Sequence, residues 1–141
     1  MEGNAITSDE IAVIRDSFAH LHRRKAETAA MFYARLFEIA PEVRPLFKDD
    51  LAVQRAALME FLAVAMAVLH DPQGLTLLLQ KLGRSHRGYG VEERHYDFIG
   101  QALIWTLRQS LGAAFTPQLE QAWLGLYSDM ANVMATAGRT A

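Results

Sequence analysis

Apolar residues recur at steps of three and four along almost the whole chain, and proline or glycine interrupts this spacing at intervals. Such spacing places apolar side chains on one face of a helix, whereas a half-buried strand alternates apolar and polar residues. No run of alternating β-branched residues is present. A chain of 141 residues is long enough to bury a core and fits one domain. We therefore expect one all-α domain over residues 1–141, with short flexible ends at about 1–7 and 137–141.

The start and stop signals predict six long helices and one short helical turn. A helix begins where Ser, Thr or Asp can cap it, and it ends at glycine or before proline. The expected elements are a helix of about fifteen residues after Thr7, a second over about 25–40, a short turn in "PEVRPLF", a third after Asp49 and Asp50, a fourth that ends at Gly88 and Gly90, a fifth over about 92–112, and a last one from Thr116.

Composition excludes several classes of function. Fourteen Lys and Arg residues oppose sixteen Asp and Glu residues, and this balance lacks the basic excess of a nucleic-acid-binding protein. The absence of cysteine excludes disulfides, zinc-thiolate sites and cysteine nucleophiles. No secretory signal and no apolar run of membrane-spanning length is evident. We expect a soluble cytoplasmic protein that binds neither nucleic acid nor membrane.

Three polar residues fall on apolar faces of the expected helices. His86 lies four residues after Leu82, while Tyr33 and Gln54 share faces with leucines and phenylalanines. A single histidine in this position is more often a core residue bonded to a backbone carbonyl than a metal ligand. Three such residues on three helices instead suggest a shared polar pocket, in which His86 could ligate a metal opposite Tyr33 and Gln54. From the residues alone, His86 can be either a core residue or a metal ligand.

Three sequence blocks resemble the bacterial haem globins, both the single-domain forms and the globin part of flavohaemoglobins. The blocks are "FYARLFEIAPEVRPLF" at 32–47, "QRAAL" at 54–58 and "LGRSHRGYGVEERHYDFIG" at 82–100, and "AW" at 122–123 agrees as well. The resemblance covers about Ile11 to Met134. It implies a globin fold that encloses a haem pocket.

The resemblance also implies a role for each matching residue. His86 matches the histidine that ligates the iron of haem b, and Tyr33 and Gln54 match the pair that donates hydrogen bonds to a gas ligand such as O₂, NO or CO. The remaining matches are apolar contacts to the porphyrin: Phe47, Leu58, Leu82, Val91, Ile99 and Leu103. These apolar residues would also suit any helical core, so the resemblance alone gives them a role.

Several neighbouring residues allow two interpretations. Tyr96 matches a tyrosine that packs under the iron-ligating histidine, although tyrosine is also common at the start of a helix. Arg84 and Arg87 could pair with haem propionates or lie in solvent. His95 is off the apolar stripe, and we expect it on the surface.

This chain departs from flavohaemoglobins in two respects. It ends at Ala141 without a reductase, and Gly138 stands where those proteins carry a glutamate near the proximal histidine. We therefore expect weaker electron donation to the iron and less peroxidase-like chemistry. Gln54 cannot serve as a second imidazole ligand, so we expect an open sixth position on ferrous iron. A bis-histidine spectrum would contradict that expectation.

The resulting functional hypotheses belong to different classes. The first is reversible O₂ binding for storage or transport. The alternative is an enzyme, a nitric oxide dioxygenase that detoxifies NO with a separate reductase as partner. A gas sensor and a non-haem interaction module are weaker alternatives. The sequence leaves monomer and homodimer equally open.

Overall fold

The computed structural model describes residues 6–47 and 50–139, and that part of the chain is helical without strands. The all-α expectation, with six long helices and a short turn at 41–46, is confirmed, and one further 3₁₀ turn was not predicted. The elements are α1 (Ser8–His22), α2 (Lys25–Ile39), the 3₁₀ helix η1 (Pro41–Leu46), α3 (Leu51–Ala67), α4 (Pro72–Gly88), α5 (Glu93–Leu111), the 3₁₀ turn η2 (Gly112–Ala114) and α6 (Pro117–Arg139).

The predicted capping residues begin the helices. Thr7 and Glu10 form a reciprocal capping box, in which the backbone N–H of Glu10 donates to Thr7 Oγ1 at 3.1 Å. Asp50 caps α3 and Thr116 caps α6, each by accepting a hydrogen bond from a backbone N–H in the first turn. Asp49, the other expected cap of α3, lies outside the described residues.

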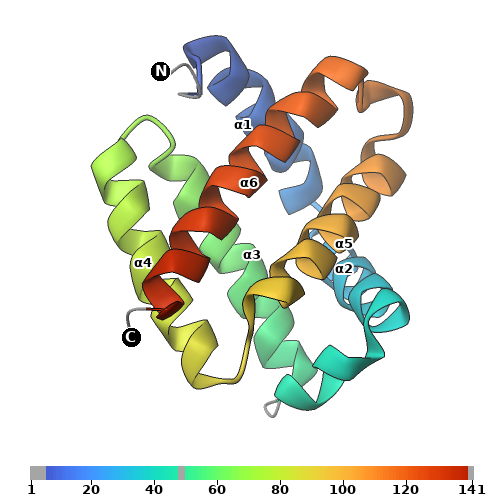
Figure 1. Ribbon diagram of the computed structural model, residues 1–141. Helices are drawn as coiled ribbons and strands as arrows, with labels where there is room; N and C mark the ends of the chain where they lie inside the picture. The colour runs from blue at the N-terminus through green and yellow to red at the C-terminus, as the bar shows by residue number, and fades with distance from the viewer. Residues whose placement is uncertain (1–5, 48–49, 140–141) are drawn as a thin grey trace.

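The helices pack in pairs around one core. Figure 1 shows α6 running across the front of the molecule, with its C-terminal end beside α4 and with α5 on its other side. α2 packs against α5, and α3 lies behind α6 in this view. The C-terminal end of α4, the first half of α3 and the start of α5 all lie in the lower part of the molecule. This arrangement brings together the helices that carry the predicted site residues.

A buried tryptophan joins the first and last helices. The side chain of Trp123 is fully buried, and its Nε1–H donates to Ser17 Oγ at 2.9 Å. The Ser17 hydroxyl in turn donates to the backbone carbonyl of Ile14 at 2.7 Å. Both buried polar groups are therefore satisfied, which avoids the cost of an unpaired donor in the core.

The two helices α4 and α6 approach each other closely at Gly83. A Cβ atom at this position would lie only 2.2 Å from the carbonyl oxygen of Met134 on α6. No residue larger than glycine fits there unless the helices separate. The contact lies one turn before His86, so it holds the end of α4 that carries this histidine against α6.

The ends of the described chain and the buried methionines complete the fold. Residues 137–139, expected within a flexible end, belong to α6, while most of the remaining expected ends lie outside the described residues.

No helix in the described ranges is long and apolar enough to cross a membrane. Met59, Met66, Met130 and Met134 are buried, as expected for core residues.

Replacing Gly83 with Ala should destabilise the protein because its methyl group would collide with the backbone of α6. Overpacking of this kind costs about 1–3 kcal/mol, and we expect a loss in that range in urea unfolding. Gly125→Ala is the matched control, since Gly125 lies on the exposed face of α6 with nothing within 4 Å of a Cβ atom. That variant should gain about 0.5–1 kcal/mol from helix propensity. Equal stability of the two variants would show that the close approach is unimportant.

Candidate functional site

His86 lies in the last turn of α4, where its ring contacts a tyrosine from the next helix. Its Nδ1 is 3.2 Å from the hydroxyl oxygen of Tyr96, which lies in the first turn of α5. The intervening turn is closed by a hydrogen bond of 2.9 Å from Val91 N–H to the His86 carbonyl. Gly90 has a φ of +93° there, a left-handed conformation that favours glycine. The structure thus brings the predicted histidine and Tyr96 together.

The contact with Tyr96 leaves one ring nitrogen of His86 without a protein partner. Nε2 makes no hydrogen bond to any described residue, whereas Nδ1 is engaged. Burial lowers the pKa of His86 below its ordinary value. A neutral imidazole whose one nitrogen is held by a partner has its other nitrogen available as a metal ligand. His86 is therefore a candidate metal ligand, with Nδ1 held by Tyr96 and Nε2 not engaged.

Tyr33 on α2 forms the centre of a second group of predicted residues. Its side chain is buried, and its hydroxyl donates a long hydrogen bond of 3.4 Å to the backbone carbonyl of Gln54 on α3. Its ring lies edge-on to that of Phe47, with 5.4 Å between ring centroids. Burial raises the pKa of Tyr33 to about 12, so the phenol keeps its proton at neutral pH and remains a hydrogen-bond donor.

The predicted apolar contacts come from several elements and pack against one common core. Leu82 lies one turn before His86, and Leu58 lies one turn after Gln54. Leu103 is buried, whereas the others are partly exposed: Phe47, Leu58, Leu82, Val91 and Ile99. These residues therefore leave apolar surface uncovered on α3 and α4, which carry Gln54 and His86, on α5, and in the segments before α3 and α5.

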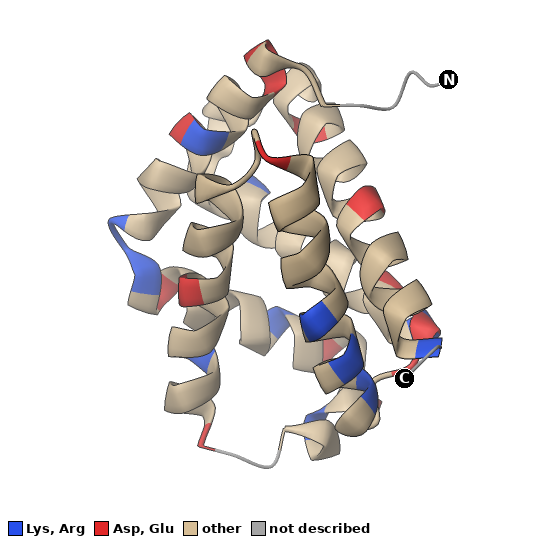
Figure 2. Cartoon of the chain, turned by 90° about the vertical axis from the view of Figure 1, so that its left-hand side faces the viewer, with Lys and Arg blue, Asp and Glu red and all other residues tan. Residues whose placement is uncertain are grey.

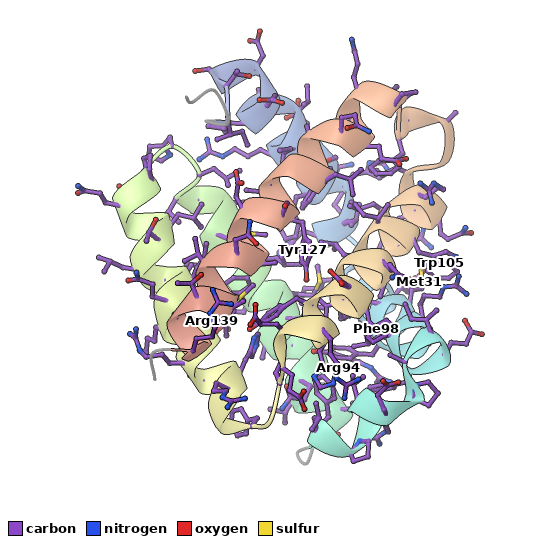
Figure 3. The ribbon with its side chains drawn as sticks, in the orientation of Figure 1. Met31, Arg94, Phe98, Trp105, Tyr127 and Arg139 are labelled. Atoms are coloured by element: carbon purple, nitrogen blue, oxygen red, sulfur yellow. The ribbon has the colours of Figure 1, made fainter. Side chains whose placement is uncertain are left out.

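Tyr127 supports Tyr96 from the last helix, and the sequence analysis did not identify it. Figure 3 shows Tyr127 lying between α6 and α5, and its hydroxyl donates to the backbone carbonyl of Tyr96 at 2.6 Å. A Cβ atom at Gly100 would lie 2.7 Å from the Tyr127 ring, so the glycine makes room for that ring. Burial raises the pKa of Tyr127 well above its ordinary range. A glycine inside a helix, one turn after Tyr96, was the signal that could have indicated this close approach.

The expectation that His95 lies on the surface is wrong. Only 3% of this residue is exposed, and its Nδ1 accepts a hydrogen bond of 2.9 Å from the backbone N–H of Glu92. His95 is the third residue of α5, and from that position its ring folds back to satisfy an N–H group that precedes the helix. Its burial is thus explained by helix capping rather than by the apolar stripe.

Comparison with known proteins identifies relatives over most of the chain. The family model described as globin matches residues 30–134. Neuroglobin from Tetraodon nigroviridis is 31% identical over 137 residues, which cover 87% of this chain and 86% of that protein. The flavohemoprotein of Vibrio cholerae is 27% identical over 131 residues, which cover 91% of this chain but 33% of the longer protein.

Solved structures share the same fold. An engineered carbene transferase from Rhodothermus marinus, described as a candidate nitric oxide dioxygenase, superposes with a TM-score of 0.85 at 25% sequence identity. The superposition covers 96% of this chain and 94% of that one. Because neuroglobins match with higher identity than the bacterial flavohemoprotein, the resemblance is not specific to bacterial globins.

The buried tyrosines predict a loss of stability at alkaline pH. Burial raises the pKa of both Tyr33 and Tyr96 from 10.0 to about 12, so their contribution to stability is complete below pH 10 and is lost as pH rises toward 12. Each group contributes a slope of up to about 1.4 kcal/mol per pH unit in that window. Tyr33→Phe should flatten the decline measured by urea unfolding, while Tyr89→Phe should not, because the Tyr89 side chain is largely exposed. Identical slopes in the two variants would contradict this account.

Proposed function

The chain belongs to the globin family, and from that premise we propose that it binds haem b through His86 and takes up O₂ reversibly. The observation that carries the proposal is the contact between His86 Nδ1 and the Tyr96 hydroxyl, which leaves Nε2 available. Bound haem supplies an iron atom at which a diatomic gas such as O₂, NO or CO binds. Orienting the ligand histidine and donating hydrogen bonds to the gas are the roles that we assign to side chains of the protein.

The residues around His86 fit a large apolar ring with a metal at its centre. Partly exposed Leu82 and Ile99 lie on the helices of His86 and Tyr96, and Val91 lies between these helices. Leu58 lies on the helix of Gln54, and Phe47, which follows η1, packs against the ring of Tyr33. A haem ring would cover this apolar surface, and burying it contributes about 25 cal/mol per Å². His86 supplies the one nitrogen ligand that the iron requires from the protein. The nitrogen of His86 and the apolar surface around it together fit a haem group.

Tyr33 and Gln54 are the residues that we assign to stabilisation of bound O₂. O₂ gains negative charge when it binds ferrous iron, and a donor in a pocket of low dielectric constant stabilises that charge. The Tyr33 phenol stays protonated at neutral pH. Its present bond to the Gln54 carbonyl is long, at 3.4 Å, so exchanging it for a better acceptor costs little.

Tyr33→Phe should accelerate O₂ release by roughly tenfold, since losing one hydrogen bond of about 1.4 kcal/mol changes a rate constant by that factor. Stopped-flow spectroscopy of the ferrous protein measures this rate. CO gains less negative charge, so its release should change much less, and Tyr89→Phe should alter neither rate. An unchanged O₂ release rate in Tyr33→Phe would remove Tyr33 from this role.

Nitric oxide dioxygenation is the second candidate function, and the likeness to a flavohemoprotein and to a candidate nitric oxide dioxygenase favours it. The reaction converts NO, O₂ and one electron into nitrate. A reductase would have to supply the electron, and the region matched here covers a third of the flavohemoprotein.

Turnover distinguishes the two functions. With excess O₂, an NADH-dependent reductase and NADH, a dioxygenase should consume many equivalents of NO per haem and release an equal amount of nitrate. Omitting the reductase should limit consumption to about one equivalent. A single turnover in the presence of a reductase that demonstrably reduces the haem would reject the enzyme and leave reversible gas binding.

A further inference from the structure

A cavity of about 500 Å³ opens between the C-terminal ends of α4 and α6 and the start of α5. Gly83, Tyr96, Met134 and Gly138 are among the residues that line it. His86 is not among them, but the predicted porphyrin contact Val91 is, so the cavity adjoins the apolar surface around His86 and reaches this histidine through Tyr96. The volume is in the range of protein sites for small molecules.

The interior of the cavity is apolar and aromatic. Tyr96 and Met134 are both buried to more than nine tenths, and Val91 is half-buried beside them. Ala135 and the two glycines contribute no bulk. An apolar body of moderate size, such as an aryl or short alkyl group, is the chemistry that this interior favours.

The rim of the cavity is charged, and most of its charges are already paired. The Arg94 guanidinium lies 2.9 Å from a Glu42 carboxylate oxygen and 3.4 Å from one of Glu92. Arg139, which Figure 3 shows at the end of α6 beside α4, pairs with Glu93. Arg87 makes no ion pair with any carboxylate in the described part of the chain. One guanidinium at the rim is therefore available for a carboxylate ligand.

The helix that carries Arg87 adds to the attraction for an anion. α4 contains Lys81, Arg84 and Arg87 but no acidic residue. In Figure 2, where α4 faces the viewer, its C-terminal half shows basic positions only. A cluster of one sign of charge raises the local concentration of ligands of the opposite sign.

We propose that this cavity is a binding site for a small amphipathic carboxylate, whose apolar body lies against Tyr96 and Met134 and whose carboxylate pairs with Arg87. The occupant lies beside the phenol that contacts His86 Nδ1. Occupancy therefore changes the support that Tyr96 gives to His86, and with it the rate of gas release. The binding site is independent of the proposed function, whereas this coupling rests on it.

The probe for binding is 4-phenylbutyrate, and 4-phenylbutan-1-ol is its uncharged counterpart. Calorimetry on the purified protein should detect binding of the carboxylate, with the alcohol at least tenfold weaker. Amide chemical shifts in NMR spectra should move at Val91, Tyr96 and Gly138. Equal affinity for the alcohol, or no shift at these amides at millimolar carboxylate, would overturn the site.

Two variants and one matched control locate the site. Arg87→Gln should weaken 4-phenylbutyrate binding at least tenfold, and Ala135→Leu should abolish it by filling the cavity. Arg84→Gln removes the same charge one turn earlier on α4, where Arg84 lines a different cavity, and should weaken binding less than twofold because only the general attraction of the helix is reduced. Unchanged binding in both Arg87→Gln and Ala135→Leu, with circular dichroism confirming that each is folded, would contradict the proposal.

Coupling to His86 has its own test. Saturating 4-phenylbutyrate should change the CO release rate of the ferrous haem-loaded protein at least twofold, and Tyr96→Phe should bind the probe but lose that change. An unchanged rate at saturation would overturn the coupling. Failure of the protein to take up haem would instead refute the proposed function. The carboxylate site would still be tested by calorimetry, which does not measure gas release.

Discussion

The close approach of α4 and α6 at Gly83 determines where the functional residues lie. Because a methyl group at this glycine would collide with the Met134 carbonyl, the two backbones can be this close only with glycine there. His86 follows on the same helix within one turn, so its position depends on that contact. The cavity beside Tyr96 lies between the same two helices. The contact at Gly83 therefore fixes the position of both His86 and the proposed carboxylate site.

Hydrogen bonds from two further helices hold His86 in place. Tyr127 on α6 donates to the carbonyl of Tyr96 on α5, and the Tyr96 hydroxyl contacts His86 on α4. This series crosses three helices and ends at the ring nitrogen opposite the one that we assign to iron. Tyr33 on α2 is protonated at neutral pH, and burial raises its pKa further, to about 12. We therefore propose different tasks for the two tyrosines: Tyr96 orients the ligand histidine and Tyr33 donates to a bound gas.

Helix periodicity and capping chemistry were sufficient to predict the helices, because both are local properties of the sequence, whereas the globin fold was predicted from the resemblance to bacterial globins. Thr7, Asp50 and Thr116 cap the helices where expected. The burial of Tyr33 also followed from its place on an apolar stripe. The exposure of His95 was predicted wrongly because its burial depends on a hydrogen bond from a backbone N–H that precedes the helix. The spacing of apolar residues along the helix does not indicate such a bond. The Tyr127 contact and the cavity depend on how distant helices pack, which spacing along one helix does not specify.

The central claim is that His86 attaches haem to this chain, and absorption spectroscopy tests it most directly. Purified ferrous protein should show a Soret band that shifts when CO is added, with one haem bound per chain. His86→Ala should lose or alter that band, and added imidazole should restore it by supplying the missing nitrogen ligand. A His86→Ala variant with the spectrum and haem content of the unmodified protein, or a folded protein that takes up no haem, would contradict the account.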